Sequence, residues 1–160
     1  MTKEILSILE EDARTTPEQL ATMTGKPKDE VIALIKQAEA DRIILKYKTV
    51  VNWEKVENEQ VWALVEVKVT PQKDVGFDAI AERIIHFPWA RTVYLLSGTY
   101  DLLVLTIGKT KNEVADFVSQ ELAAIEGVQG TVTHFMLKRY KEDGVILDGE
   151  EIIKRQPVIL

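Results

Sequence analysis

The chain has 160 residues, of which 46% are hydrophobic and 29% are charged, and it carries a formal net charge of −6. This length permits one domain or two small ones, and the composition is typical of a globular protein. Because there is no cysteine, disulfides, thiolate metal sites and a cysteine nucleophile are excluded, and the acidic balance argues against a protein that coats nucleic acid through bulk positive charge.

Positive charge is nevertheless concentrated in one segment. Residues 1–52 contain eight basic and nine acidic side chains, and six of these eight basic residues lie between positions 26 and 48. The first residues soon become acidic, so a signal peptide is not expected. The sequence contains no run of about 18 apolar residues, so a membrane span is not expected either. The default location is the cytoplasm.

The first part of the chain predicts three short helices, the first over residues 3–11. Thr16 and Gln19 flank a proline in the pattern of a capping box, so a second helix begins there. Gly25 can end this helix, and Pro27 can open the third. The hydrophobic positions that repeat at helical spacing are Ile5, Leu6, Ile8 and Leu9 in the first helix and Val31, Ile35 and Ala38 in the third.

Two short runs of β-branched and aromatic residues follow at 43–47 and 49–51. Only Lys48 separates them, and together they suit a small hairpin or wing. The stretch 52–60 is polar and acidic, so we place a domain boundary there. The expected organisation is a three-helix domain with a wing at 1–52, a linker at 53–60 and a second domain at 61–160.

The hydrophobic period changes after the linker. From Val61 to Thr70, valine and alanine alternate strictly with other residues, which predicts a strand with two different faces. A helix that stops before Pro88, two strands joined by a tight turn, a second helix closed by Gly127 and a last strand follow. The expected bounds are 77–85 and 114–125 for the helices and 92–97, 101–107 and 132–137 for the strands, and the tail 144–160 can add an edge strand.

Two βαβ units in succession indicate a ferredoxin-like βαββαβ domain, and the whole chain is then of the α+β class. Its sheet should be antiparallel, with both helices on one face. The other face would present apolar side chains that no helix of this chain covers, so we expect a homodimer that packs sheet to sheet. The side chains expected on that face are Trp62, Leu64, Tyr94 or Leu95, and Leu103 or Val104.

This layout resembles the leucine-responsive and asparagine-operon regulators, the Lrp/AsnC family, over nearly the whole chain. Residues 17–52 resemble the family's helix-turn-helix and wing, and SGTYDLLVLT at 97–106 resembles its G-x-Y-D hairpin. The resemblance implies an N-terminal winged helix-turn-helix that binds promoter DNA through its third helix. It also implies a dimer that often assembles into octamers and responds to an amino acid or a related small molecule. The matching positions of the first segment include Leu20, Ala21, Gly25, Glu39, Ile44, Tyr47 and Asn52.

The exposed side of the third helix is the expected DNA contact. Lysines on an exposed helix are commonly only solvated, but the resemblance implies base or phosphate contacts there and phosphate contacts from the wing. The candidate DNA-binding residues are Lys28, Lys36, Gln37, Lys46 and Lys48.

Several positions depart from the family pattern. Pro27 stands where serine often caps the third helix, Leu34 where arginine is common, and Arg42 where glycine often precedes the wing. Asp29 and Glu30 lie in the first turn of the helix, where they suit the helix dipole but repel phosphate. We expect DNA affinity to be low or to depend on avidity in a larger assembly. A small-molecule-binding oligomer that no longer reads DNA stays open as an alternative.

The resemblance places the effector between neighbouring dimers, against the hairpin and the last strand. Gly98 also suits any hairpin turn that needs a positive φ, and Tyr100 suits any strand. The carboxylate of Asp101 is poorly placed for burial but well placed to hold a ligand amine. The candidate effector-binding residues are Gly98, Thr99, Tyr100 and Asp101, with Thr131, Thr133 and His134 as weaker candidates.

The sequence offers no catalytic motif. His86 and His134 are far apart in the chain and lack a metal-ligand constellation, and no phosphate-binding or nucleophile-elbow pattern occurs. Divergent relatives of this architecture act in haem biosynthesis, but an enzyme of that kind would need a basic pocket containing histidine. We therefore expect no enzymatic activity, no metal and no cofactor.

Overall fold

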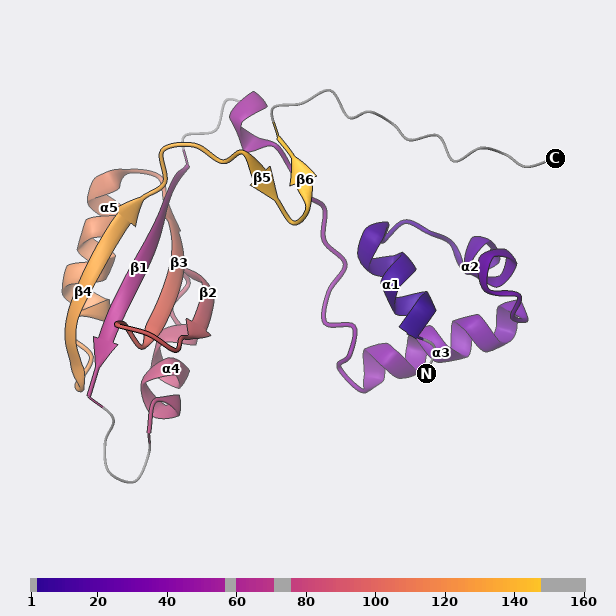
Figure 1. Ribbon diagram of the computed structural model, residues 1–160, viewed down its shortest axis with the longest axis horizontal. Helices are drawn as coiled ribbons and strands as arrows, with labels where there is room; N and C mark the ends of the chain where they lie inside the picture. Colours follow the sequence, from indigo (N-terminus) through magenta and orange to yellow (C-terminus); the bar gives the residue numbers. More distant parts are fainter. Residues whose placement is uncertain (1–2, 57–59, 71–75, 148–160) are drawn as a thin grey trace. The chain divides into compact units, whose positions relative to one another are not determined.

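The computed structural model describes residues 3–56, 60–70 and 76–147. Contacts within the chain divide it into two compact units, Met1–Val51 and Asn52–Leu160 (Figure 1). Among the described residues, no helix is both long and apolar enough to span a lipid bilayer.

The first unit contains the three expected helices: α1 at Lys3–Glu11, α2 at Pro17–Thr24 and α3 at Lys28–Ala40. The capping box is confirmed, because Thr16 Oγ1 accepts the Gln19 amide at 3.3 Å and Gln19 Oε1 accepts the Thr16 amide at 2.8 Å. Gly25 ends α2 in the left-handed conformation, with φ of 67°. These local bonds satisfy groups that a helix end leaves without partners.

The helices pack around a small apolar core. Its buried members come from all three helices, and Leu34 and Ile44 pack against it while partly exposed. Leu34 therefore serves the core of this unit, which gives the absence of arginine there a structural reason. The buried members are Ile5, Leu9, Leu20 and Val31.

The hairpin expected at 43–51 was a wrong prediction, because residues 42–52 contain no strand. A hairpin needs a connection of at least two residues with suitable backbone angles, and a single residue, Lys48, separates the two runs. The amides of Ile43 and Ile44 instead donate to the Ala38 carbonyl at 2.8 and 3.0 Å. Arg42 makes this turn with φ of 57°, a left-handed conformation that favours glycine.

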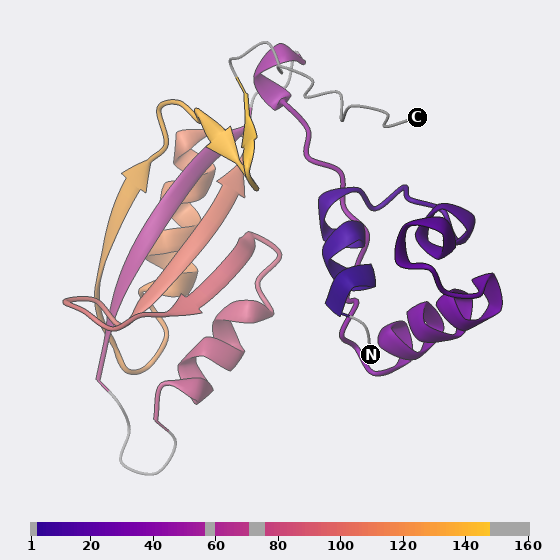
Figure 2. The same ribbon diagram turned by 45° about the vertical axis from the view of Figure 1, so that its right-hand side comes forward.

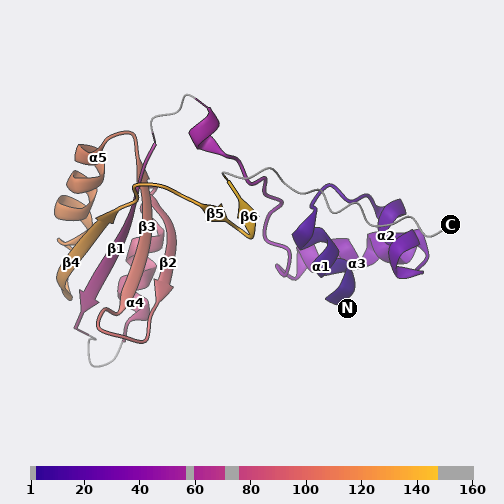
Figure 3. The same ribbon diagram turned by 45° about the horizontal axis from the view of Figure 1, so that its top comes forward.

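The second unit has the expected βαββαβ order. Its strands form one antiparallel sheet in the order β2-β3-β1-β4, which Figure 2 shows side by side. Both helices lie on the same side of this sheet (Figure 1, Figure 3). The ferredoxin-like prediction is confirmed. The elements are β1 Val61–Val69, α4 Asp78–Ile85, β2 Ala90–Leu95, β3 Leu102–Gly108, α5 Lys111–Asp116, the π-helix η2 Phe117–Leu122 and β4 Val128–Phe135.

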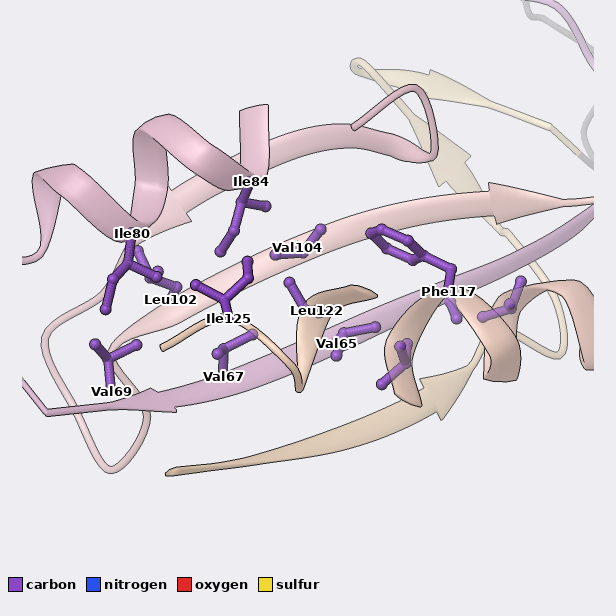
Figure 4. Packing of buried hydrophobic residues seen from close by; sticks show 13 residues of the cluster. Val65, Val67, Val69, Ile80, Ile84, Leu102, Val104, Phe117, Leu122 and Ile125 are labelled. Carbon is purple, nitrogen blue, oxygen red and sulfur yellow. The ribbon is translucent and has the colours of Figure 1, made fainter. Parts of the chain in front are cut away.

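The strand register determines which side chains the helices cover. Val65 lies opposite Val104 on one side and opposite Thr133 on the other, and Val104 lies opposite Val93. Because directly opposed residues point to the same face, all four face the helices. Figure 4 shows this core from close by. Its fully buried members include Val65, Val67, Ile84, Leu102, Val104 and Leu122.

The second helix departs from a regular α-helix. The Ala123 amide donates to the Val118 carbonyl at 2.8 Å, an i→i+5 bond within the π-helical part. Phe117 and Leu122 are five residues apart, and both are buried against the sheet. The wider turn lets positions at this unusual spacing share one buried face.

The tail 144–160 was expected to add an edge strand, and its described part, residues 144–147, does not. β5 at Lys141–Glu142 and β6 at Val145–Ile146 instead pair with each other in a separate two-stranded sheet. Leu147, which follows this hairpin, is buried. Its carbonyl accepts a hydrogen bond from Asn52 Nδ2 at 2.9 Å, which links the end of the hairpin to the start of the second unit. The rest of the expected tail strand, 148–160, lies outside the described residues.

Candidate functional site

The exposed side of α3 carries three of the expected DNA contacts. The helix buries Val31 and Ala38, whereas Lys28, Lys36 and Gln37 are exposed. Lys28 and Lys36 are eight residues apart, which corresponds to about 12 Å along the helix axis. The helix therefore presents two cations on adjoining sides, little more than two turns apart.

Lys28 is held by a neighbouring helix. Its ammonium group forms an ion pair with Glu18 of α2. The side-chain hydrogen bond between the two groups raises the pKa of Lys28 and lowers the pKa of Glu18. Both groups are exposed, so water and salt screen the pair. Lys28 must give up this partner, or share it, before it can contact a phosphate.

Other polar groups near this surface are paired in the same way. Lys26 forms an ion pair with Glu30, and Gln37 Nε2 donates to Asp41 Oδ1 at 2.8 Å. Within the part of the chain that the structure describes, Lys36 and Lys46 form no ion pair. Of the candidate DNA-binding lysines, these two would have no acidic partner among the described residues to give up on contacting a phosphate. Lys46 and Lys48 lie on the exposed segment that follows α3.

Pro27 occupies the N-cap position of α3 and makes no side-chain cap bond. The family's serine would supply such a bond, worth about 1 kcal/mol. Asp29 and Glu30 in the first turn partly offset that loss through the helix dipole. The same two carboxylates bring negative charge to the helix end that approaches DNA in helix-turn-helix proteins.

The connection between β2 and β3 is closed by main-chain and carboxylate bonds. The Leu96 amide donates to the Asp101 carbonyl at 2.8 Å, and the Asp101 amide donates to Val67 at 3.0 Å. Asp101 Oδ2 accepts from the Val69 amide at 2.8 Å, and the Lys68 ammonium lies 3.1 Å from the same oxygen. Asp101 thus ties the base of the hairpin to the end of β1.

The environment of Asp101 favours its ionised form. The hydrogen bond from the Val69 amide is the main cause of a lowered pKa, with a further contribution from Lys68. The side chain is only 15% exposed. The carboxylate therefore has a structural role that its position in the sequence did not reveal, and its availability to a ligand amine stays a prediction.

Gly98 differs from the expectation for a hairpin glycine. Its φ is not in the left-handed region, and a Cβ atom added there would meet no heavy atom within 4 Å. The idea that the turn requires glycine for a positive φ was wrong. The space above Gly98 is open, and Thr99 beside it is exposed, whereas Tyr100 is half-buried.

The expected residues of the last strand do not share one face. Thr131 lies opposite Val67 and Thr133 opposite Val65, so both belong to the helix-covered side. His134 lies on the open face, with Nε2 at 3.3 Å from Glu66 Oε2. Thr131 is level with the base of the hairpin, whereas His134 is three residues, or about 10 Å, further along the strand. The structure brings the hairpin and Thr131 to the same end of β1 and leaves His134 apart.

The face of the sheet opposite the helices is rich in apolar side chains. The register places Tyr94 and Leu103 on this face and leaves Leu95 and Val104 on the helix side, which settles the two alternatives. Tyr94 is 58% exposed, and Leu64 and Leu103 are half-buried. The apolar members of this open face are Trp62, Leu64, Tyr94, Leu103, Leu105, Ile107 and Val132.

Sequence reasoning missed a contact at one end of this face. The Arg139 guanidinium lies over the Trp62 ring, 4.8 Å from its centroid, and its Nε is 4.0 Å from Glu54 Oε1. No periodic pattern marks Arg139, because it follows the last strand in an irregular segment. Across the described ranges, no group of three or more metal-ligating side chains comes together.

Comparison with known families agrees with this architecture. The family model described as the Lrp/AsnC ligand binding domain matches residues 62–146. An uncharacterised HTH-type transcriptional regulator of Bacillus subtilis, YugG, is 44% identical over 153 residues, which cover 95% of this chain and 92% of that protein. The HTH-type transcriptional regulator FL11 of Pyrococcus furiosus is 29% identical over 88% of this chain and 89% of its own length.

Solved structures share the fold over most of the chain. The transcriptional regulator NMB0573 of Neisseria meningitidis, solved in complex with L-Met, aligns with a TM-score of 0.70 and 25% identity. That alignment covers 91% of this chain and 94% of the other. The protein PH0061 aligns with a TM-score of 0.75 and 19% identity over 90% and 95% of the two chains, and at that identity the likeness concerns the fold alone.

Proposed function

The chain belongs to the Lrp/AsnC family, and we propose that it is a sequence-specific DNA-binding transcription regulator whose DNA affinity responds to an amino acid or a related small molecule. The observation that carries this proposal is the match of the Lrp/AsnC ligand binding domain to residues 62–146, in a chain whose preceding unit has three helices. The names of the relatives are those of transcriptional regulators, which agrees with a role outside catalysis.

We propose that the two units act as separate domains: a DNA-binding domain at 1–52, joined through residues 53–60 to an effector-binding and oligomerisation domain at 61–160. In the first, α3 enters the major groove. Lys36 and Gln37 face the bases or the adjacent phosphates, and Lys46 and Lys48 contact phosphates beside the helix. Lys28 joins them when DNA phosphates replace Glu18 as its partner, an exchange between charged groups that salt weakens.

The effector is proposed to bind at the β2–β3 hairpin. The open space above Gly98 lets a ligand approach the backbone closely, and Thr99, Tyr100 and Thr131 offer hydroxyl groups near the same end of β1. Asp101 holds the hairpin in place, and its side chain keeps a small exposed fraction. We infer that Thr133 and His134 contribute less directly, because both lie further along β4 from the hairpin than Thr131 does, and His134 is paired with Glu66.

Dimerisation is proposed to occur through the open sheet face. In a single chain that face leaves Tyr94 and Val132 exposed beside the half-buried Leu64 and Leu103, and an apolar area of this kind is stabilised by burial against another surface. A second copy offers the same apolar face, and such dimers assemble further toward octamers. A stable monomer at micromolar concentration, measured by light scattering, would contradict this arrangement.

The central experiment is a gel shift with DNA from upstream of the protein's own gene, at low and moderate salt, with a scrambled fragment for comparison. We expect preference for the natural fragment, and a change of affinity on adding an amino acid, with L-methionine as the first probe. Lys36→Gln should weaken binding to both fragments, whereas Lys109→Gln, an exposed lysine of the second unit, should not. Equal binding to both fragments at both salt concentrations would overturn the proposal that the protein is a sequence-specific regulator.

A second function is favoured by one observation. The ion pairs Lys28–Glu18 and Lys26–Glu30 neutralise two of the cations nearest the DNA-facing helix end. They suit a small-molecule-binding oligomer whose helical unit no longer reads sequence. That protein would be stabilised against heat by L-methionine and would bind natural and scrambled DNA alike.

A further inference from the structure

A cleft on the helix side of the second unit has no part in the function proposed above. It lies between the end of α4 and the π-helix η2, and its volume is about 580 Å³, within the range of small-molecule sites. Its lining includes the charged groups Glu82, Arg83 and Glu121, the imidazole of His86, and the apolar side chains of Phe87 and Ile125.

The floor of this cleft is firmly packed. The Phe87 ring meets the Phe117 ring edge to face, with centroids 5.5 Å apart and planes at 74°. Ile125 is only 8% exposed and packs in the core beside Leu122 (Figure 4). These contacts leave a preformed apolar floor, which lowers the entropy that a ligand's binding would cost.

One wall of the cleft is the π-helical segment itself. Its i→i+5 bond from Ala123 to Val118 is a rare backbone arrangement that occurs often at functional sites. Leu122 is buried toward the sheet, whereas the preceding Glu121 is exposed and lines the cleft. The same backbone that completes the core therefore presents a carboxylate at the edge of the cleft.

The charged groups around the floor are exposed and, among the described residues, have no oppositely charged side chain as partner. Within residues 76–147, Glu82, Arg83 and Glu121 form no ion pair, and His86 Nδ1 lies 2.6 Å from the Glu82 carbonyl oxygen. The charges of Glu82, Arg83 and Glu121 sum to −1. A complementary ligand brings two cationic groups and one anionic group, with an apolar part between them.

We propose that this cleft binds a basic α-amino acid, a ligand whose methylene chain joins an amino-acid head to a second cationic group. The Arg83 guanidinium donates hydrogen bonds to the ligand's carboxylate, and Glu82 and Glu121 face its two cationic groups. The methylene chain covers Phe87 and Ile125. A zwitterion without the second cation would leave one carboxylate unmatched, and an anionic ligand would face two carboxylates. The site is separate from the hairpin and goes beyond the function proposed above.

Isothermal titration of the full chain without DNA tests this directly. L-lysine should bind saturably, L-norleucine, which lacks the second ammonium group, should bind at least tenfold more weakly, and L-glutamate should not bind. Arg83→Gln and Glu121→Gln should each weaken L-lysine binding at least tenfold. The exposed residues Arg91 and Glu126 lie outside the lining, so Arg91→Gln and Glu126→Gln are the matched controls and should bind as the original chain does.

Absence of saturable L-lysine binding would overturn the proposal, as would equal affinities of the original chain and Glu121→Gln. If norleucine bound as tightly as lysine, the claim that the cleft selects a basic amino acid would be overturned. If Arg83→Gln and Glu121→Gln changed the mass in solution and no ligand bound, the cleft would be a contact between subunits. Because the titration contains no DNA, failure of the regulator proposal would leave its outcome unaffected.

Discussion

Asp101 Oδ2 accepts a hydrogen bond from the backbone amide of Val69 at 2.8 Å. The two residues lie 32 positions apart, at the base of the β2–β3 hairpin and at the end of β1. This bond, together with the Lys68 ammonium group at 3.1 Å, holds the proposed effector hairpin against the sheet. The position of the hairpin therefore depends on a carboxylate whose charge changes with pH.

The Asp101 contact should make stability depend on pH in the acid range. Its pKa is lowered in the folded protein by the Val69 amide and by Lys68, so the contribution is complete above the unfolded-state pKa near 3.8 and is lost as pH falls through the folded value. Asp101→Asn should melt at a lower temperature at pH 7 and should lose less stability than the original chain between pH 5 and pH 2. Thermal melts across that range, with the exposed Asp78→Asn as control, measure it. Parallel pH profiles for Asp101→Asn and the original chain would contradict the role.

Gly98→Ala should separate ligand binding from folding. The backbone at Gly98 has no positive φ, and an added Cβ meets no atom within 4 Å, so the melting temperature should hardly change. A ligand that lies against this backbone would collide with the new methyl group. We expect the thermal shift produced by L-methionine to fall or vanish, while the unliganded melt is preserved. An unchanged shift would place the effector elsewhere.

Arg42→Gly should stabilise the first unit. Arg42 has φ of 57°, a conformation that costs a residue with a Cβ atom about 1 kcal/mol and that glycine adopts freely. Hydrogen exchange of the Val31 and Ala38 amides in α3 should slow accordingly, because it reports opening of this unit by itself. Arg42→Ala also removes the charge but keeps Cβ, and should give little gain. Equal effects of the two variants would indicate that charge, not backbone conformation, is responsible.

Thr106→Val should stabilise the second unit by about 1 kcal/mol. Thr106 is completely buried in β3, and its hydroxyl has no hydrogen-bond partner among the described residues. Valine has nearly the same shape and removes that uncompensated polar group. Urea denaturation, followed by a signal from the sheet of the second unit, should show a higher urea concentration at the midpoint of unfolding. Thr106→Ser keeps the hydroxyl and loses a methyl group, so it should lower the midpoint, and a gain from serine would refute the explanation.

Glu18→Gln should strengthen DNA binding. Loss of the carboxylate releases Lys28, which adds one phosphate contact and makes the slope of log affinity against log salt steeper by about one. Gel shifts at several salt concentrations measure that slope. Glu10→Gln removes one negative charge from the exposed side of α1 and is the matched control for overall charge. Identical slopes for the two variants would show that Lys28 does not reach DNA.

The order of elements could be predicted because each carries its own periodicity. The alternation along β1 and the capping box at Thr16 depend on residues close in sequence, and local backbone preferences and hydrophobic patterning determine such features. The wing prediction failed for the converse reason. The β-branched runs on either side of Lys48 had strand propensity, but no connection long enough to pair them.

The proposed sites were less predictable from local pattern. Asp101 looked like a free carboxylate because the Val69 amide that occupies it is 32 residues distant. Thr133 and His134 are neighbours in the chain, yet the alternation of side chains places them on opposite faces. The cleft beside η2 joins residues of two helices, and no single segment of the chain contains it.

The sequence by itself determined the three helices of the first unit, the βαββαβ order of the second and the family, because these follow from short-range periodicity and from motifs that are contiguous in the chain. Only the tertiary structure decided which charges are paired, which side of β4 each residue takes, and where an open space remains beside Gly98. Those properties depend on distances between segments far apart in sequence. The free energy of a charge or a hydroxyl group is set by the atoms around it, and residues such as Glu18 and Val69 become neighbours of Lys28 and Asp101 only when the chain has folded.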